Sequence, residues 1–324
     1  MILRYHGYRN WITQDVITDD LMFDYTFGFE LEVQRKRSAT INCEEMATKL
    51  SEVFGELFVF QHDSSIGDGF EIISQPMTWN YFQSNLNKFK KLLDMLNEHN
   101  FRSHDGGRCG LHVHVGKRAL GLSREDVDLL TSLHCTENII AVENDKKQQK
   151  IILNIQFILE RFQQEIYDFS RRNNYQYAKP ITELKRVDNG TEIIDRAKIT
   201  NRTIRGNHIN TRDDRYVNLN LQNENTIEFR MFRGTLKWET FYFSINFINN
   251  IINMSKVSNN LITFKQLVLT GLKNDKYDAC IEYCNTRNID LENDKVVQLS
   301  SVDIKKKKTI NKRDLYLRMM TELN

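Results

Sequence analysis

The sequence predicts an α+β fold, in which helices pack on the apolar face of an antiparallel β-sheet. Several segments alternate apolar and polar residues at period two, which is typical of strands with one buried face. Other segments repeat apolar residues every three or four positions, as amphipathic helices do. The 324 residues are 40% hydrophobic and 27% charged, which fits a soluble globular protein with a sizeable core.

The first clear strand covers residues 25–35, where apolar residues alternate with Gly28, Glu30 and Glu32. The same criterion predicts later strands at residues 70–74, 109–116, 215–222 and 226–233. A tight turn at residues 223–225 joins the last two, so we expect them to pair as a hairpin. Residues 1–24 are expected to form a lead-in that contributes an edge strand.

Helices are predicted where the apolar spacing becomes helical, and the most apolar of them is the last. Their ranges are 43–54, 79–99, 123–142, 150–173 and 238–254. Residues 62–69 form a turn-rich, glycine-containing loop, and the polar residues 174–213 predict long loops. The remainder is expected to be helical and increasingly basic. Its lysine run at 305–308 suits a solvated helix face or a contact with an acidic partner.

No linker clearly separates two domains. We therefore predict one domain over residues 1–260, with a helical insertion at about 120–175, and a C-terminal helical extension over residues 261–324.

Charge and cysteine content exclude several classes of protein. The formal net charge of +2 offers no global basic field for nucleic acid. No apolar run approaches the length of a membrane span, and residues 1–10 lack an apolar signal segment. Five cysteines, an odd number, argue for reduced thiols. We therefore expect a cytoplasmic protein with no nucleic-acid or membrane partner; the oligomeric state is not readable.

Five predicted strands carry polar residues opposite their apolar face, and none of these polar residues is a lysine. They are Glu30 and Glu32, Glu71 with its loop partner Asp63, His112 and His114, Asn218 and Asn220, and Glu228 and Arg230. One interpretation is the solvated side of an antiparallel sheet. The other is a divalent-metal site, since converging carboxylates repel one another unless a cation neutralises them.

The donor types indicate which ion would suit such a site. Oxygen ligands with one or two imidazoles suit Mg²⁺ or Mn²⁺ better than structural zinc. Mg²⁺ keeps positions for phosphate oxygens, and Arg215 and Arg230 would then stabilise a transferring phosphoryl group. The chain has no phosphate-binding P-loop and no convincing dinucleotide-binding fingerprint, so a nucleotide would bind through metals and arginines.

In their order along the chain, these strands resemble the amidoligase family, a branch of the carboxylate–amine ligase superfamily that includes glutamine synthetase. The resembling motifs are Phe27–Glu32, His62–Ser65, Gly69–Ser74, Cys109–Val115, Arg215–Asn220 and Thr226–Arg230 with Gly234–Leu236. They extend from about residue 25 to residue 236, and together they are specific. The resemblance implies a curved catalytic sheet like that of glutamine synthetase, within a catalytic domain over residues 1–260.

The resemblance also implies roles for individual residues. Glu32, Asp63 and Glu71 would hold one metal ion, and Glu30, His112 and Glu228 the other. Arg215, Arg230 and Glu228 would be catalytic, and His114, Asn218, Arg215 and Arg230 would contact the nucleotide or substrate. Two features depart from glutamine synthetase: Asp63 replaces a glutamate, and the lead-in is too short for a separate N-terminal domain. We therefore do not expect its substrates or its oligomer.

The function implied is an ATP-dependent carboxylate–amine ligase. It would form an amide or isopeptide bond through an acyl phosphate, using ATP and two or more Mg²⁺ ions, with Mn²⁺ as a substitute. The substrates would be small-molecule, peptide or protein carboxylates and amines. A metal-dependent phosphotransferase or hydrolase on the same fold, and a catalytically inactive binding relative, stay open as alternatives.

Overall fold

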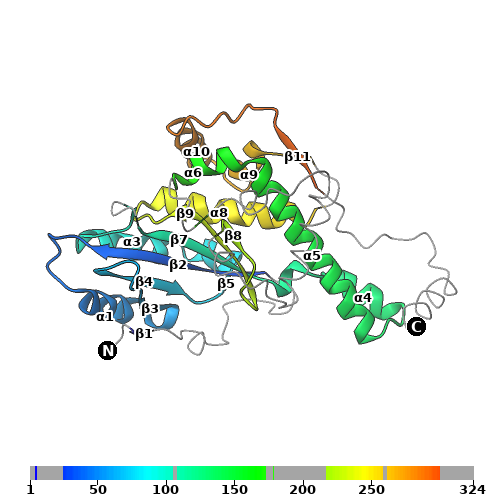
Figure 1. The fold of residues 1–324 in the computed structure, drawn as a ribbon, viewed down its shortest axis with the longest axis horizontal. Helices are drawn as coiled ribbons and strands as arrows, with labels where there is room; N and C mark the ends of the chain where they lie inside the picture. Colours follow the sequence, from blue (N-terminus) through cyan, green and yellow to red (C-terminus); the bar gives the residue numbers. More distant parts are fainter. Residues whose placement is uncertain are drawn as a thin grey trace, which may run out of the picture.

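The computed structural model describes residues 4–5, 25–104, 108–172, 178, 217–257 and 261–299 (Figure 1). Arg215, nearly all of the irregular segment 174–213 and the lysine run at 305–308 lie outside these residues. The described residues form a mixed α+β structure around a single large sheet, which confirms the predicted class.

The main sheet has nine described strands, and neighbours follow the order β1-β3-β4-β2-β7-β9-β8. β5 and β6 pair with the two ends of β2, and every pairing is antiparallel except β1 with β3. The strands are β1 (Arg4–Tyr5), β2 (Thr26–Arg35), β3 (Phe58–His62), β4 (Gly69–Ser74), β5 (Met77–Thr78), β6 (Phe101–Arg102), β7 (Gly110–Gly116), β8 (Leu219–Asn220) and β9 (Thr226–Arg233).

The expected strands are present, with two differences. β3, β5 and β6 were not predicted, because the five residues Phe58–His62 of β3 are mostly apolar without alternation and β5 and β6 have only two residues each. The strand expected at residues 215–222 is described only from residue 217, and its ladder is the two-residue β8. β8 pairs with β9 across the 223–225 turn, so the predicted hairpin is confirmed. β1 supplies the predicted edge strand.

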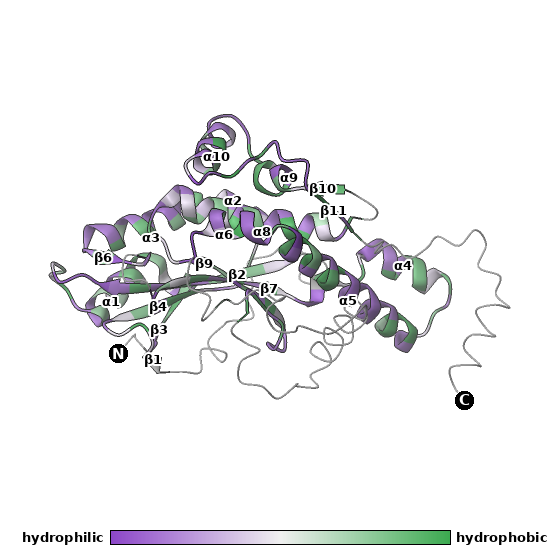
Figure 2. Cartoon of the chain, turned by 45° about the horizontal axis from the view of Figure 1, so that its top comes forward, coloured by the Kyte–Doolittle hydropathy of each residue, from purple (hydrophilic) through white to green (hydrophobic). Residues whose placement is uncertain are grey.

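Helices cover the apolar face of the sheet and form a second layer, with α9 and α10 lying above them (Figure 2). The helices are α1 (Cys43–Phe54), α2 (Trp79–Ser84), α3 (Leu86–Glu98), α4 (Arg124–Ser132), α5 (Glu137–Arg161), α6 (Gln163–Ser170), α8 (Trp238–Ser255), α9 (Phe264–Leu269) and α10 (Asp275–Asn285). Two short 3₁₀ helices, η2 (Gly55–Leu57) and η4 (Arg118–Leu120), are also described. No described helix is long and apolar enough to cross a membrane.

Three regions predicted to be helical differ in the structure. The helix expected at 79–99 breaks at Asn85, whose φ of −122° is not helical. Residues 123–173 form three helices rather than two, because His134 has a φ of 58° and Phe162 has a φ of −106°. The C-terminal part was expected to be helical, yet it contains the paired strands β10 (Leu261–Thr263) and β11 (Val296–Gln298). Strands of three residues are too short to show a period.

The apolar side chains of β2 anchor the core. Phe27, Phe29, Leu31 and Val33 are at most 3% exposed. The ring of Phe29 makes edge-on contacts with Phe241 of α8 at 5.1 Å between centroids and with Phe89 of α3 at 6.1 Å. This packing fixes which face of β2 is buried, and therefore directs the alternate residues of β2 to the opposite, polar face.

Candidate active site

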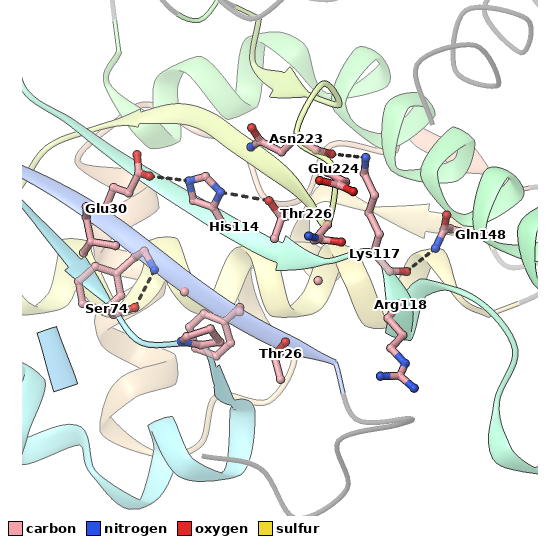
Figure 3. Close-up of a pocket in the computed structure, with 17 residues that line it drawn as sticks. Thr26, Glu30, Ser74, His114, Lys117, Arg118, Gln148, Asn223, Glu224 and Thr226 are labelled. Carbon is pink, nitrogen blue, oxygen red and sulfur yellow. Dashed lines mark hydrogen bonds and ion pairs between the residues drawn. The ribbon is translucent and has the colours of Figure 1, made fainter. Parts of the chain in front are cut away.

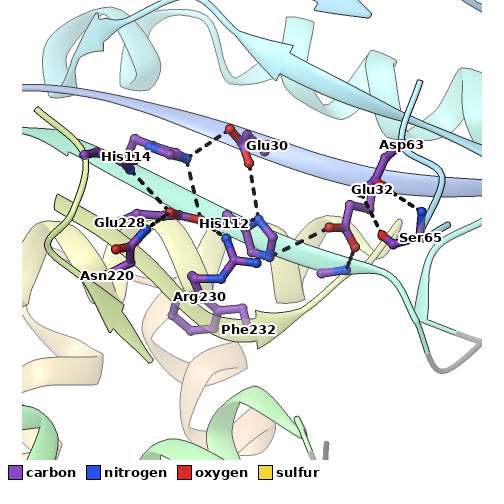
Figure 4. Close-up of polar contacts among 12 residues, drawn as sticks. Glu30, Glu32, Asp63, Ser65, His112, His114, Asn220, Glu228, Arg230 and Phe232 are labelled. Carbon is purple, nitrogen blue, oxygen red and sulfur yellow. Dashed lines mark hydrogen bonds and ion pairs between the residues drawn. The ribbon is translucent and has the colours of Figure 1, made fainter. Parts of the chain in front are cut away.

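The first acidic group joins three strands of the polar face. Its members are Glu30 of β2, His114 of β7 and Glu228 of β9, whose ligand atoms all lie within 4.8 Å of one another. His114 Nε2 is 3.1 Å from Glu30 Oε1 and 4.0 Å from Glu228 Oε1 (Figure 4). Sheet register accounts for part of this grouping, since His114 lies directly opposite Glu228. Two carboxylates and an imidazole form a donor set suited to a divalent cation.

His112, two residues before His114 on the same face of β7, contacts the same carboxylates. Its Nδ1 is 3.3 Å from Glu30 Oε2 and 3.6 Å from Glu228 Oε1, and its Nε2 is 3.9 Å from Glu32 Oε1. The side chain is only 2% exposed. The resemblance assigned His112 to this metal and His114 to the nucleotide or substrate. The structure brings both imidazoles to Glu30 and Glu228. It is the His114 ring, rather than the His112 ring, that joins these carboxylates in the set of ligand atoms within 4.8 Å of one another.

The second acidic group consists of Glu32, Asp63 and Glu71, whose carboxylate oxygens again lie within 4.8 Å of one another. Glu32 on β2 is opposite Glu71 on β4, and Asp63 follows β3 directly. Asp63 accepts hydrogen bonds from the backbone N–H of Ser65 at 2.7 Å and from its hydroxyl at 2.8 Å. Glu32 Oε2 accepts from the backbone N–H of Gly110 at 2.5 Å. The three carboxylates expected to share a metal therefore lie together.

The carboxylate of Glu228 is held by several donors. Arg230 Nη1 donates to its Oε1, while the side-chain amides of Asn220 and Asn223 donate to Oε2 at 2.8 Å and 3.3 Å. Asn218 is 4% exposed, and its backbone carbonyl accepts from the Arg230 N–H at 2.9 Å. Its side-chain oxygen has no hydrogen-bond partner within the described part of the chain. Asn218 therefore lies beside Arg230, one of the two expected catalytic residues that the structure describes.

The two groups differ in their charge balance. Burial by itself would raise the pKa of Glu30 and of Glu228, but His114, with Arg230 beside Glu228, holds both pKa values below the usual range. Burial would lower the pKa of His114, yet Glu30 and Glu228 raise it. In the second group, burial and the neighbouring carboxylates raise the pKa of Glu71 to about 10. In the first group, the positive charges of His114 and Arg230 thus offset the negative charges of Glu30 and Glu228. The second group has no cation among its three members, so Glu71 is stabilised by a bound proton or by a metal ion.

A cavity of about 850 Å³ opens beside the first group. It begins at Glu30 and His114 and extends to the end of β7 and the 223–225 turn (Figure 3). Gly28 and Gly116 line it without side chains. Lys117 is 6% exposed, and its Nζ donates to the carbonyls of Leu221, at 3.2 Å, and Asn223. No motif in the sequence marks this cavity, because its lining comes from several segments that are distant in the chain.

The comparisons with known proteins bear on this arrangement. The family model described as "Putative amidoligase enzyme" matches residues 59–252, more than half of the chain. The chain belongs to the amidoligase family. That membership implies a carboxylate–amine ligase. No curated protein matches the chain.

The amidoligase match contains both histidines of β7, Asp63, Glu71 and Glu228. Glu30 and Glu32 on β2 precede it, and the structure is what joins them to the matched residues. Both acidic groups fit divalent cations by the chemistry of their donors. The raised pKa of the half-buried Glu71, which its neighbouring carboxylates help to cause, is the clearest sign that a cation would stabilise the second group in its ionised form.

Proposed function

We propose that this amidoligase is an ATP-dependent carboxylate–amine ligase that forms an amide or isopeptide bond through an acyl phosphate and uses two or more Mg²⁺ ions. The observation that carries the proposal is the placement of two acidic groups on adjacent strands with Arg230 beside the first. The same proposal includes a sheet curved like that of glutamine synthetase. It also includes a catalytic domain over residues 1–260.

The chemistry explains why such a site needs a nucleotide. A carboxylate is a poor acylating agent because oxide is a poor leaving group. Transfer of the γ-phosphoryl group of ATP to the acid gives an acyl phosphate, which an amine attacks with loss of inorganic phosphate. Most of the catalysis of phosphoryl transfer is positioning and charge stabilisation. Carboxylates, imidazoles and arginines converging on one face are suited to both tasks.

In this proposal each acidic group has its own ion. Glu30, Glu228 and the histidines of β7 would hold the ion on the nucleotide side, and Glu32, Asp63 and Glu71 the ion on the side of the acceptor carboxylate. When bound, the ions neutralise phosphate charge and orient phosphate oxygens. Arg230 would contact the transferring phosphoryl group. Arg215 is assigned the same task by resemblance.

The cavity beside the first group supports placing the nucleotide there. It has a volume of about 850 Å³, within the usual range for small-molecule sites, and it meets the first acidic group through Glu30 and His114. Gly28 and Gly116 contribute only backbone to its lining, and Arg118 is also among its lining residues. His114 would orient the nucleotide at the boundary between cavity and metal, with Asn218 assigned to nucleotide contact by resemblance.

The test is an assay of ADP and phosphate release with Mg²⁺-ATP and pooled acids and amines, followed by mass spectrometry of the products. We expect release to require both an acid and an amine, with a product lighter by one water than their sum. Glu228→Ala should lower kcat by at least about 100-fold, because it removes a proposed ligand of the ion that would stabilise the phosphate charge. Glu239→Ala, at an exposed carboxylate on α8, is the matched control and should leave kcat unchanged.

The outcomes separate the alternatives. ADP release without a joined product would support a phosphotransferase or hydrolase instead. A chain that binds no Mg²⁺-nucleotide would be an inactive relative. Ligation that persists in Glu228→Ala would contradict the assignment of the site. The proposal covers carboxylate and amine substrates that are small molecules, peptides or proteins. It also includes a cytoplasmic location, with no nucleic-acid or membrane partner.

A further inference from the structure

Arg172 is a buried cation outside the motifs that carry the resemblance. It lies just beyond α6, which ends at Arg171 in a left-handed conformation with a φ of 50°. Arg171 is exposed and donates from Nη2 to the carbonyl of Thr286 at 3.2 Å. Arg172 is only 9% exposed. The two adjacent arginines therefore face different surroundings, and only Arg172 enters the interior.

The guanidinium of Arg172 bridges two carbonyls of β9. Its Nη1 donates to the backbone oxygens of Arg230 and Phe232, each at 2.7 Å. These carbonyls lie on either side of Met231. At this point the register between β7 and β9 shifts, because Leu111 pairs with Phe232 whereas Val113 pairs with Phe229. A single guanidinium nitrogen thus holds both sides of an irregularity in the strand that carries Arg230.

The same nitrogen lies close to the polar face of β7. A Cβ added to Gly110 would be 2.9 Å from Arg172 Nη1 and 2.8 Å from His112 Nε2, so the glycine leaves the room that both groups occupy. Burial, followed by repulsion from Arg230, lowers the pKa of Arg172 to about 10, and Glu32 and Glu228 oppose this shift. The guanidinium therefore remains charged at neutral pH, near carboxylates of both acidic groups.

A bulged strand sets the direction of its side chains through its local backbone conformation. Arg230 is held on one side by its N–H bond to the Asn218 carbonyl at 2.9 Å and on the other by the bond that its own carbonyl accepts from Arg172. We propose that Arg172 is a positioning residue, which holds the β9 irregularity so that Arg230 points at the phosphoryl group of the bound nucleotide. The inference rests on the proposed function, because it presumes an anion at Arg230.

A double-mutant cycle on nucleotide affinity tests this inference. The probe is a non-hydrolysable ATP analogue with Mg²⁺, titrated by calorimetry into the full chain. We expect Arg172→Gln to weaken affinity about tenfold, the size of a lost hydrogen bond to a charged group. Arg230→Gln should weaken it at least as much. The double variant should bind within about twofold of Arg230→Gln alone, because Arg172 acts through Arg230.

Two further variants separate positioning from folding. Arg171→Gln removes the same charge from the neighbouring, exposed position and should bind the analogue as the wild type does. Arg172→Lys, which keeps a charged donor, should recover most of the lost affinity. Circular dichroism monitors the fold of every variant. If Arg172→Gln does not fold, the cycle is run with Arg172→Met, which keeps the length of the side chain without its charge, and the same loss and lack of additivity are expected.

The outcomes are distinguishable from failure of the proposed function. Additive losses in the cycle, in a chain whose wild type binds the analogue, would overturn the role of Arg172 and leave the ligase proposal standing. Equal weakening by Arg171→Gln would show a general effect of charge and overturn it as well. A wild-type chain that binds no Mg²⁺-nucleotide would overturn both proposals.

Discussion

The three neighbouring carboxylates of the second acidic group lead to a quantitative prediction about the pH dependence of metal binding. Burial and the carboxylates of Glu30, Glu32 and Asp63 raise the pKa of Glu71 to about 10 in the metal-free protein. At neutral pH this carboxyl therefore carries a proton. A divalent ion that binds to Glu32, Asp63 and Glu71 must displace that proton, so metal affinity should depend on pH.

The magnitude follows from the size of the shift. One pKa unit corresponds to about 1.4 kcal/mol, so affinity should rise about tenfold per pH unit between about pH 6 and pH 9. Stability should change in the opposite direction when no metal is present. The folded protein binds the Glu71 proton more tightly than the unfolded chain, whose pKa is near 4.5. The free energy of unfolding should therefore fall as pH rises from about 5 to about 10, by up to about 1.4 kcal/mol per unit from this group.

Calorimetric titration with Mn²⁺ in two buffers of different ionisation enthalpy measures the protons released per ion bound. Glu71→Gln should release about one proton fewer than the wild type and bind Mn²⁺ more weakly, with a smaller dependence on pH. In the absence of metal at pH 8, the same variant should be at least as stable as the wild type, because glutamine imitates the protonated carboxyl. Glu52→Gln on the exposed side of α1 is the matched control and should change none of these quantities.

Two results would refute this reasoning. One is a Glu71→Gln variant that releases as many protons as the wild type, since the displaced proton would then come from another group. The other is metal-free stability that increases between pH 6 and pH 9 and increases equally in both proteins. Either result would mean that Glu71 is ionised before metal binds.

Three predictions concern the framework of the site. Gly110→Ala should destabilise the fold by about 1–3 kcal/mol and lower nucleotide affinity, because its Cβ would meet His112 and Arg172 at under 3.0 Å; urea unfolding and calorimetry measure the two effects. Phe29→Ala should lower the free energy of unfolding by about 3–5 kcal/mol, since the ring is 1% exposed; a loss below about 1 kcal/mol would contradict the packing described. Asn42→Ala should cost about 1 kcal/mol by removing the N-cap of α1, and unfolding that is unchanged in urea would argue against that cap.

Local patterns were sufficient for much of the framework. The alternation in β2 predicted which side chains face the core, and Phe29 and Leu31 are buried while Glu30 and Glu32 meet other acids. This works because the faces of a strand depend only on its own period of two. The limits of α1 agree for a similar reason, since its first turn is set by the capping box of Asn42 and Glu45.

The order of the motifs along the chain also predicted the amidoligase family, and the family match confirms it. The division of the acidic residues into two sets followed from the resemblance, and the structure brings the second set together as expected. The assignment of these sets to metal ions stays a prediction.

The grouping of the remaining side chains was decided by tertiary structure. Period two places His112 and His114 on one face but does not determine which carboxylate each contacts; that depends on register with β2 and on the shift between β7 and β9. The contacts of Arg172 join residues 58 and 60 positions apart, from a helix end to a distant strand. The sequence by itself thus determined the strands that carry the polar face and the family. Only the folded chain decided which charges meet, because electrostatic contacts depend on distance in space and not on spacing in sequence.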